Sequence, residues 1–296
     1  MNFNMTNSLY YENLTSKPVP KGVLIISHGM AEHIGRYKWL ISKLNLDGYH
    51  VISKDHRGHG RNIENGGLLG FFSNKNGWIK VRDDQEKLIK YVRKEYEGLP
   101  CFLLAHSMGS WIALSLLNNK LDIDRIILSG SSKVPFLLIY IQLFIIKIEI
   151  FRNGPESQST LIDKMTIRKF NNFFAPNRTP NDWISSDTES VDNYTNDPLC
   201  GFIVTNSLWN DVCQCMLRIF KKNYYSSSNF NIPIMILSGK NDAANASSKY
   251  AQKLYLFLNK IFKSVQLIIL NDTRHEVFTD IQKDISYNHL KEFITK

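Results

Sequence analysis

Cysteine is scarce in this chain, and its spacing suggests neither a disulfide framework nor a zinc site. The four cysteines among 296 residues are Cys101, Cys200, Cys213 and Cys215, and no two of them form a C-x-x-C pair. This usage predicts reduced thiols and a cytoplasmic location. Because a chain of this length can bury a sizeable core without disulfides or metals, we expect no metal and no other cofactor.

The sequence also lacks a secretory signal and a membrane-spanning run. Residues 1–7 contain no basic stretch followed by an apolar one, so secretion is not expected. Residues 134–146 (VPFLLIYIQLFII) are apolar apart from Gln142, and Lys147 follows them. A helix needs about 20 apolar residues to cross a bilayer core of roughly 30 Å. We therefore expect an apolar helix that is buried or lies at a membrane surface.

Charge of one sign is not concentrated in any part of the chain. Lys and Arg number 36 against 27 Asp and Glu, which makes the formal net charge +9. Such an excess can attract nucleic acid or anionic membranes, but the basic residues are scattered among many Asn, Ile and Lys, as AT-rich codons would produce. We expect no nucleic-acid partner, and a weak attraction to anionic lipid stays open.

Short apolar runs alternate with helical patterns along most of the chain, which is typical of a parallel sheet with helices on both faces. The expected strands are 22–27, 50–54, 101–105, 125–129, 234–238 and 265–270. The expected helices lie near 36–46, 78–95, 107–119, 245–262 and 281–294. Residues before 21 are expected to form a leading antiparallel hairpin.

This alternation stops after residue 130. Residues 133–205 show helical patterns without a clear strand, and the next strand pattern begins at residue 234. Helices inserted at this point of a doubly wound sheet would cover the carboxyl ends of the strands, where such sheets bind ligands. The predicted fold is α/β: residues 1–132 and 206–296 form the core, and residues 133–205 form an inserted helical cap.

Residues 105–109 (AHSMG) join an apolar strand pattern to an apolar helical pattern. A serine on such a tight strand-turn-helix is typical of a nucleophile elbow. The two backbones pass close together there, so small residues are needed two positions before and after Ser107. Gly109 meets this need, and Ala105 adds only a methyl group, which we expect to be tolerated. The pattern predicts Ser107 as a nucleophile.

A serine hydroxyl becomes a good nucleophile when an imidazole accepts its proton and a carboxylate orients that imidazole. In the elbow arrangement the chain order is Ser, acid, His. Asp242 follows the strand expected at 234–238, and His275 follows the strand expected at 265–270. Asp272 is a rival acid, but it lies close before the histidine and is expected to shape that loop. We predict Ser107, Asp242 and His275 as the catalytic residues.

Two backbone N–H groups must bind the oxyanion that develops during acyl transfer, one after the nucleophile and one from the loop after an early strand. Met108 follows Ser107, and the turn His28-Gly29-Met30 follows the strand expected at 22–27. Met30 and Met108 are therefore the predicted donors. Residues 55–60 (DHRGHG) hold two histidines near an acid but no complete ligand set, so they predict a turn and not a metal site.

With these motifs in place, the chain resembles the monoacylglycerol lipase and lysophospholipase branch of the α/β-hydrolases, which is grouped with the serine aminopeptidases. The core residues that carry the resemblance are 28–33 (HGMAEH), Arg36-Tyr37, 55–60, the elbow around Ser107, Ser238-Gly239 and 274–276 (RHE). The expected cap resembles bacterial members in residues 161–164 (LIDK) and 192–202 (DNYTNDPLCGF). The chain departs from the family pattern at Ala105, where glycine is usual, and at 243–244, where a proline is often seen.

The resemblance implies an α/β-hydrolase fold and hydrolysis of a carboxylic ester (EC 3.1.1 type), with a monoacylglycerol or lysophospholipid as substrate and an acyl-enzyme on Ser107. Three alternatives stay open: a thioesterase, an N-terminal (proline-type) aminopeptidase with the same triad, and a catalytically silent binding module. The expected partners are a small acyl-ester or lipid substrate and, peripherally, a membrane touched by the cap; the oligomeric state stays open. Residues of the apolar stretch that are candidates to line an acyl pocket or touch a membrane, with core packing as the alternative, are Phe136, Leu137, Leu138, Ile139, Phe144 and Ile145.

Overall fold

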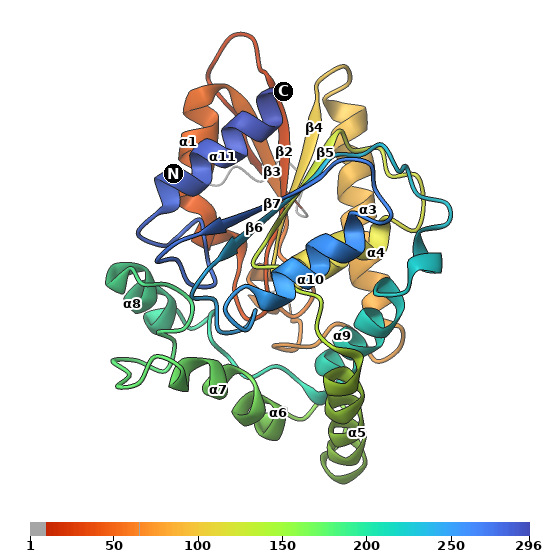
Figure 1. The fold of residues 1–296 in the computed structure, drawn as a ribbon, viewed down its shortest axis with the longest axis vertical. Coiled ribbons are helices and arrows are strands. Elements are labelled where there is room, and N and C mark those ends of the chain that lie inside the picture. The colour runs from red at the N-terminus through yellow and green to blue at the C-terminus, as the bar shows by residue number, and fades with distance from the viewer. Residues whose placement is uncertain (1–9, 65) are drawn as a thin grey trace.

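Figure 1 shows the computed structural model, which describes residues 10–64 and 66–296. A sheet with the strand order β1-β3-β2-β4-β5-β6-β7 runs through the molecule. β1 is antiparallel to β3, and the other neighbouring strands are parallel. The strands are β1 (Tyr11–Asn13), β2 (Gly22–Ser27), β3 (Tyr49–Ser53), β4 (Cys101–His106), β5 (Arg125–Ser129), β6 (Ile234–Gly239) and β7 (Val265–Leu270). The predicted parallel sheet is confirmed, and each predicted strand agrees with an observed one to within one residue at either end.

The predicted leading hairpin falls partly on residues 1–9, which lie outside the described residues. Among residues 10–20 there is one strand, β1, and it lies antiparallel on β3 and not on a second strand of this segment. One edge of β3 is free for this partner because β2 occupies the other and is itself flanked by β4. Residues 1–7, for which no secretory signal is expected, lie outside the described residues.

Helices cover both faces of the sheet because alternate residues of each central strand point to opposite sides. Val23 and Ile25 of β2 belong to one buried cluster, and Leu24 and Ile26 belong to the other. The first cluster is shared with α3 (Gly77–Glu95), α4 (Met108–Leu116), α9 (Asn206–Ile219) and α10 (Lys249–Leu258). The second is shared with α1 (Lys38–Asp47) and α11 (Lys283–Thr295). Two faces buried in this way explain why the strands are apolar along their whole length.

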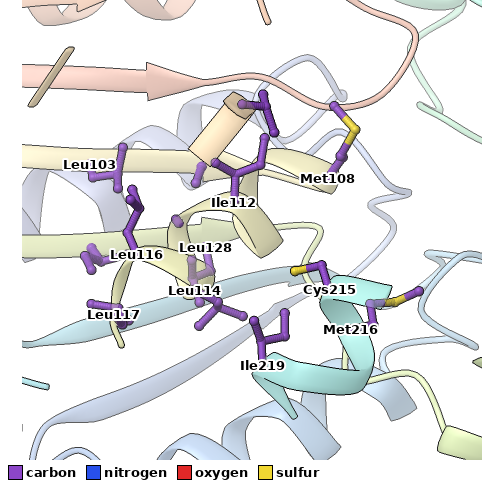
Figure 2. Close-up of a cluster of buried hydrophobic side chains, with 14 of the residues drawn as sticks. Leu103, Met108, Ile112, Leu114, Leu116, Leu117, Leu128, Cys215, Met216 and Ile219 are labelled. Atoms are coloured by element: carbon purple, nitrogen blue, oxygen red, sulfur yellow. The ribbon is translucent and has the colours of Figure 1, made fainter. Parts of the chain in front are cut away.

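The helix that follows the elbow lies in the centre of the first cluster. Figure 2 shows Ile112 and Leu114 of α4 beside the sheet, with Cys215 and Ile219 of α9 facing this helix from the other side. All four cysteines are buried and unbridged. Three short elements outside the inserted region are η1 (Ile34–Tyr37), α2 (Arg61–Glu64) and η2 (Lys222–Tyr225).

One helix begins later than expected. The pattern predicts a helix from residue 245, but α10 begins at Lys249. Ala246, Ser247 and Ser248 have φ values of +49°, +54° and +63°, which a right-handed helix does not allow. The turn that contains Asp242 therefore extends to residue 248.

The chain between β5 and β6 supplies the inserted helices. α5 (Phe136–Asn153), α6 (Thr160–Met165), α7 (Ile167–Asn172) and α8 (Thr188–Asn196) lie together on one side of the molecule in Figure 1. In the part of the chain that the structure describes, each helix falls short of the length or apolar character that a bilayer-crossing segment requires.

Candidate active site

Ser107 lies at the turn between β4 and α4 and has an unusual backbone conformation. Its φ is +48° and its ψ is −118°, a region that residues other than glycine rarely adopt. The turn is held by the Ser107 N–H, which donates to the carbonyl oxygen of Ser129 at 2.9 Å. A Cβ atom on Gly109 would lie 2.3 Å from the carbonyl oxygen of Ser27, so the close approach of strand and helix requires glycine there. Ala105 lies within β4 and is fully buried.

The structure brings the three predicted catalytic side chains into one hydrogen-bonded chain. His275 Nε2 lies 3.0 Å from Ser107 Oγ, and His275 Nδ1 lies 2.9 Å from Asp242 Oδ2. The Asp242 carboxylate can only accept, so Nδ1 carries the ring proton and Nε2 is free to accept one from the serine. Asn245 holds the carboxylate by donating from its side-chain amide to Oδ2 at 2.8 Å. The arrangement can transfer a proton from Ser107 to His275 as the hydroxyl attacks an electrophile.

Burial and charge shift the pKa of the His275 imidazole in opposite directions. Burial of His275 lowers its pKa, but the nearby Asp242 carboxylate and its hydrogen bond outweigh this, so the pKa is raised above 6.5. The neighbouring ring of His106 is also buried, and there burial and the charge of His275 lower the pKa to about 3. Trp183 of the cap packs against the His275 ring, with ring centroids 4.9 Å apart. The site thus holds one imidazole that can take up a proton and one that stays neutral.

Asp272, the rival acid, lies elsewhere. Its side chain is exposed, and its carbonyl oxygen accepts a hydrogen bond from the Ser186 hydroxyl at 3.2 Å. Its φ is +52°. Asp272 therefore shapes the loop before His275, and Asp242 is the carboxylate that contacts the imidazole.

The turn after β2 lies directly against the nucleophile. A Cβ atom on Gly29 would lie only 3.2 Å from Ser107 Cβ. Met30 and Met108 both line the cavity that Ser107 enters. Their role as oxyanion donors stays a prediction.

A buried charged cluster beside the triad was not assigned by the sequence analysis. Glu32 accepts from the Gly29 N–H and, at 3.0 Å, from the Tyr37 hydroxyl. Arg36 Nη2 lies 2.6 Å from Glu276 Oε2. Burial and the neighbouring charge of Glu276 raise the pKa of Glu32 to about 8, whereas Arg36 overcomes the effect of burial and holds the pKa of Glu276 below its usual range. The sequence could have pointed to this cluster, because Glu32, Arg36 and Glu276 belong to the family motifs that contain or follow Met30 and His275.

Ser107 and His275 line a cavity of about 520 Å³ between the strand-end loops and the cap. A pocket of this size is typical of small-molecule sites. Most of its wall is apolar and comes from the cap and α4, including Trp111, Val134, Leu138, Ile141, Ile162, Ile167, Phe170, Phe173, Trp183 and Phe202. Its polar lining includes Glu32, Gln142, Thr166, Asn181, Tyr194 and Glu276.

Of the candidate residues of α5, Leu138 lines the cavity, together with Ile141, which was not a candidate. Ile139 is fully buried in the core, Phe136 and Ile145 pack at the edge of the core, and Leu137 and Phe144 are 70% and 66% exposed. A pocket-lining role for Phe136, Leu137, Ile139 and Phe144 is therefore wrong. The physical reason is that α5 is apolar on every side, so its sequence has no polar face to reveal how the helix is rotated.

Among residues 10–64 and 66–296, His33, Asp197 and Cys200 offer ligand atoms within 4.8 Å of one another. The hydrogen bonds do not suit a metal, because the Gly35 N–H donates to His33 Nδ1. The ring proton is then on Nε2, which lies 2.9 Å from Asp197 Oδ2 and donates to it. This group therefore links η1 to the segment after α8 by a hydrogen bond.

Known proteins resemble this chain in sequence and in fold. The family model for serine aminopeptidases, S33, matches residues 18–282. The monoglyceride lipase of Rattus norvegicus is 32% identical over 61% of this chain and 52% of its own length. A monoglyceride lipase homolog of Monkeypox virus is 37% identical over 38% of this chain and 39% of its own length. The chain thus spans about half or less of the length of these curated relatives. The thermostable carboxyl esterase of Bacillus coagulans, solved with glycerol, is 26% identical, with a TM-score of 0.85 over 97% of this chain and 92% of that one.

Proposed function

The chain belongs to the serine aminopeptidase S33 family of α/β-hydrolases, and from this premise we propose that it is a serine esterase that hydrolyses monoacylglycerols or lysophospholipids. The single observation that carries the proposal is the pair of hydrogen bonds that link Asp242 to His275 and His275 to Ser107 in the wall of a mostly apolar cavity. A surface serine would have neither the base nor the acyl-sized pocket.

Acylation begins when Ser107 Oγ attacks the carbonyl carbon of the ester and its proton passes to His275 Nε2. Asp242 stabilises the imidazolium that forms, and the Met30 and Met108 N–H groups donate to the carbonyl oxygen as it becomes negative. The tetrahedral intermediate collapses, the bond to the alcohol oxygen breaks, and His275 protonates that oxygen. The products of this half-reaction are a free alcohol and an ester of Ser107.

Deacylation repeats these steps with water. His275 takes a proton from the water as it attacks the acyl-enzyme, and then returns a proton to Ser107 Oγ as the fatty acid leaves. The same oxyanion donors serve both half-reactions, because both pass through a tetrahedral intermediate at the same carbon.

The composition of the cavity wall supports a substrate with an acyl chain. Burying each methylene contributes about 0.8 kcal/mol, so aromatic and aliphatic residues from the cap would hold such a chain without any charged contact. The names of the rat and viral relatives, which refer to monoglyceride lipases, point to the same class of substrate.

The carboxylates near the triad favour an ester over a peptide with a free amino terminus. An aminopeptidase needs an available negative charge to bind the substrate's ammonium group. Glu276 is already paired with Arg36 at 2.6 Å, and Glu32 is buried and bonded to Gly29 and Tyr37. Neither carboxylate is available without breaking this cluster.

We extend the proposal to the cap, residues 133–205, as a peripheral contact with a membrane that contains the substrate. Leu137, Phe144 and Phe151 lie on the outward side of α5 and are 70%, 66% and 91% exposed. Leu138 and Ile141, on the neighbouring face of the same helix, line the cavity. Contiguous exposed apolar side chains mark interaction surfaces, and here they border the pocket that a lipid must enter.

The test is labelling by a fluorophosphonate probe followed by a substrate panel. The wild-type protein should be labelled and Ser107→Ala should not. Monoacylglycerols and lysophospholipids of graded chain length should then be compared with acyl thioesters and with a proline p-nitroanilide. Esterase activity that depends on chain length supports the proposal, and a preference for the anilide or the thioester would replace it with the corresponding alternative. A well-folded wild-type protein that neither labels nor turns over any of these compounds would leave the binding-module alternative.

A further inference from the structure

The cap motif at residues 192–202 resembles that of bacterial relatives but has no role in the mechanism above. In the structure it begins within α8 and continues past residue 200 to the cavity wall. Its side chains and backbone contact the segment that follows β2, far away in the sequence. Two of these contacts reach Ala31, the residue that follows Met30.

The carbonyl oxygen of Ala31 receives two hydrogen bonds from this motif. The Tyr194 hydroxyl donates to it at 2.9 Å, and the Gly201 N–H donates to it at 2.9 Å. Ala31 has a φ of +54°, a left-handed conformation that residues other than glycine rarely adopt. Such a conformation persists where the surrounding structure holds it, and these two donors are the contacts that do so at its carbonyl.

Two neighbouring contacts attach the cap to the same segment. His33 Nε2 donates to Asp197 Oδ2 at 2.9 Å. Arg36 donates to the Ser190 carbonyl oxygen at 3.3 Å, and its guanidinium carbon lies 5.1 Å from the centre of the Tyr194 ring. Gly201 has a φ of +66°, and a Cβ atom on it would lie 3.1 Å from the Tyr194 ring. The motif therefore fits closely against residues 31–36.

The preceding peptide is held from the core side. His28 Nδ1 lies 2.8 Å from the Gly29 carbonyl oxygen, and the His56 N–H donates to His28 Nε2 at 2.9 Å. The ring of His28 therefore donates through Nδ1 to Gly29. Because a trans peptide is planar with its C=O and N–H pointing in opposite directions, this bond orients the N–H of Met30. Met30 and Ala31 thus lie between the Gly29–Met30 peptide, which the core holds, and the Ala31–Glu32 peptide, which the cap holds.

We propose that Tyr194 is a positioning residue for the oxyanion hole, acting from the cap through the carbonyl of Ala31 to hold the Met30 N–H in place. The proposal rests on the serine esterase mechanism proposed above. Its consequence is that the cap takes part in catalysis as well as enclosing the acyl chain. Loss of the tyrosine hydroxyl should impair stabilisation of the transition state more than binding of the substrate, because the oxyanion donors act most strongly on the charged intermediate.

The test is Tyr194→Phe, which removes the hydroxyl and keeps the ring beneath Arg36. With 4-nitrophenyl butyrate as substrate, we expect kcat to fall roughly tenfold, less than the loss of about 10²–10³ that follows removal of an oxyanion donor itself. KM should change less than about twofold. The inhibition constant of an alkyl trifluoromethyl ketone, which forms a tetrahedral oxyanion adduct with the serine, should rise by about the same factor as kcat falls. The acid limb of the pH profile should not move, since His275 is untouched.

Tyr224→Phe is the matched control. The Tyr224 hydroxyl also donates to a backbone carbonyl oxygen, that of Ser115, at 2.7 Å, but it lies away from the turn. Both variants should lose a similar amount of stability, measured by thermal unfolding, while only Tyr194→Phe loses kcat and ketone affinity. If Tyr194→Phe does not fold, Asp197→Ala cuts the neighbouring link to His33 and should lower kcat about two- to fivefold in the same pattern.

The outcomes separate this inference from the proposed function. An active wild-type protein with unchanged kcat and ketone affinity in Tyr194→Phe overturns the inference alone, as does equal loss of kcat in Tyr224→Phe. A wild-type protein that is inactive and unlabelled overturns the esterase proposal and this inference with it.

Discussion

The strand-end loops and the cap helices border the same cavity but are built on different principles. The loops supply polar side chains that are buried and individually hydrogen-bonded: Asp242 to Asn245 and His275, and His275 to Ser107. The cap supplies mostly apolar side chains, some buried and some exposed on the outer side of α5. Hydrogen bonds depend steeply on distance and angle, whereas apolar contact is non-directional. Catalytic activity should therefore be lost on almost any substitution in these loops. In the cap, substitutions should matter mainly at its buried face and at the residues that contact the turn after β2.

The most severe test of this contrast is removal of the nucleophile or the base. Ser107→Ala and His275→Ala should each lower kcat/KM on the order of 10⁴- to 10⁶-fold and by similar amounts, because triad members act as a unit. Steady-state kinetics on a soluble ester and circular dichroism, to verify folding, check the result. Substantial activity in His275→Ala would assign the base to another residue.

The second test removes the charge that orients the base. Asp242→Asn should lower kcat on the order of 10³- to 10⁴-fold, because the amide favours the wrong tautomer of the imidazole. The exposed carboxylate of Asp272 provides the matched control, and Asp272→Asn should stay within about twofold of wild type. A large loss in Asp272→Asn would make the rival acid the functional one.

The pH dependence of kcat/KM gives a further measurement of the effect of Asp242 on His275. His275 must be neutral to accept the serine proton, and its pKa is raised above 6.5 by Asp242 in spite of burial. Wild-type kcat/KM should therefore rise with pH through a midpoint above 6.5 and fall as the pH drops below it. In Asp242→Asn the raising charge is gone and burial remains, so the midpoint of the residual activity should move to lower pH. A midpoint that does not move would mean that Asp242 does not act on the imidazole.

Within the cap, we expect the free energy of unfolding to depend on whether a substitution alters the buried or the exposed face of α5. Ile139 is fully buried and Phe144 is 66% exposed. Ile139→Ala should lower the free energy of unfolding by about 2–4 kcal/mol, and Phe144→Ala by less than about 0.5 kcal/mol. Urea denaturation followed by fluorescence measures both. Equal effects of the two changes would mean that the helix is rotated differently from its position in the structure.

The smallest expected effect concerns membrane contact. Leu137 on α5 and Leu46 on α1 are 70% and 71% exposed, so serine at either position removes the same side chain from a similarly exposed place. Leu137→Ser should weaken binding to phosphatidylcholine–phosphatidylglycerol vesicles roughly tenfold, the loss of about one leucine's transfer free energy, and Leu46→Ser should leave it unchanged. Cosedimentation measures both, and equal weakening would remove α5 from the contact surface.

The predictions from sequence succeeded where the signal was local. The strands are continuous apolar runs bounded by turns, and Ser107 stands at a junction with glycine at the required spacing. The loops of Asp242 and His275 could be placed because the carboxyl ends of parallel strands share one edge of a sheet. The pairing of β1 with β3 was not predicted, since pairing depends on which strand edge is free. Most of the candidate pocket residues on α5 do not line the cavity, since an apolar helix does not reveal its rotation. The contacts of Arg36 with Glu276 and of Tyr194 with Ala31 also escaped prediction, because these partners lie far away in the sequence.

The parallel sheet, the elbow and the three side chains at the carboxyl edge of the sheet could be read from the amino-acid sequence, because strand periodicity, glycine placement and chain order are properties of neighbouring residues. The residues of α5 that face the cavity and the carboxylate that contacts the imidazole became clear only from the folded structure. So did the contact of the cap with the turn after β2, through bonds from Tyr194 and Gly201 to Ala31. These outcomes depend on angles and distances of a few ångströms between segments that meet only when the chain has folded.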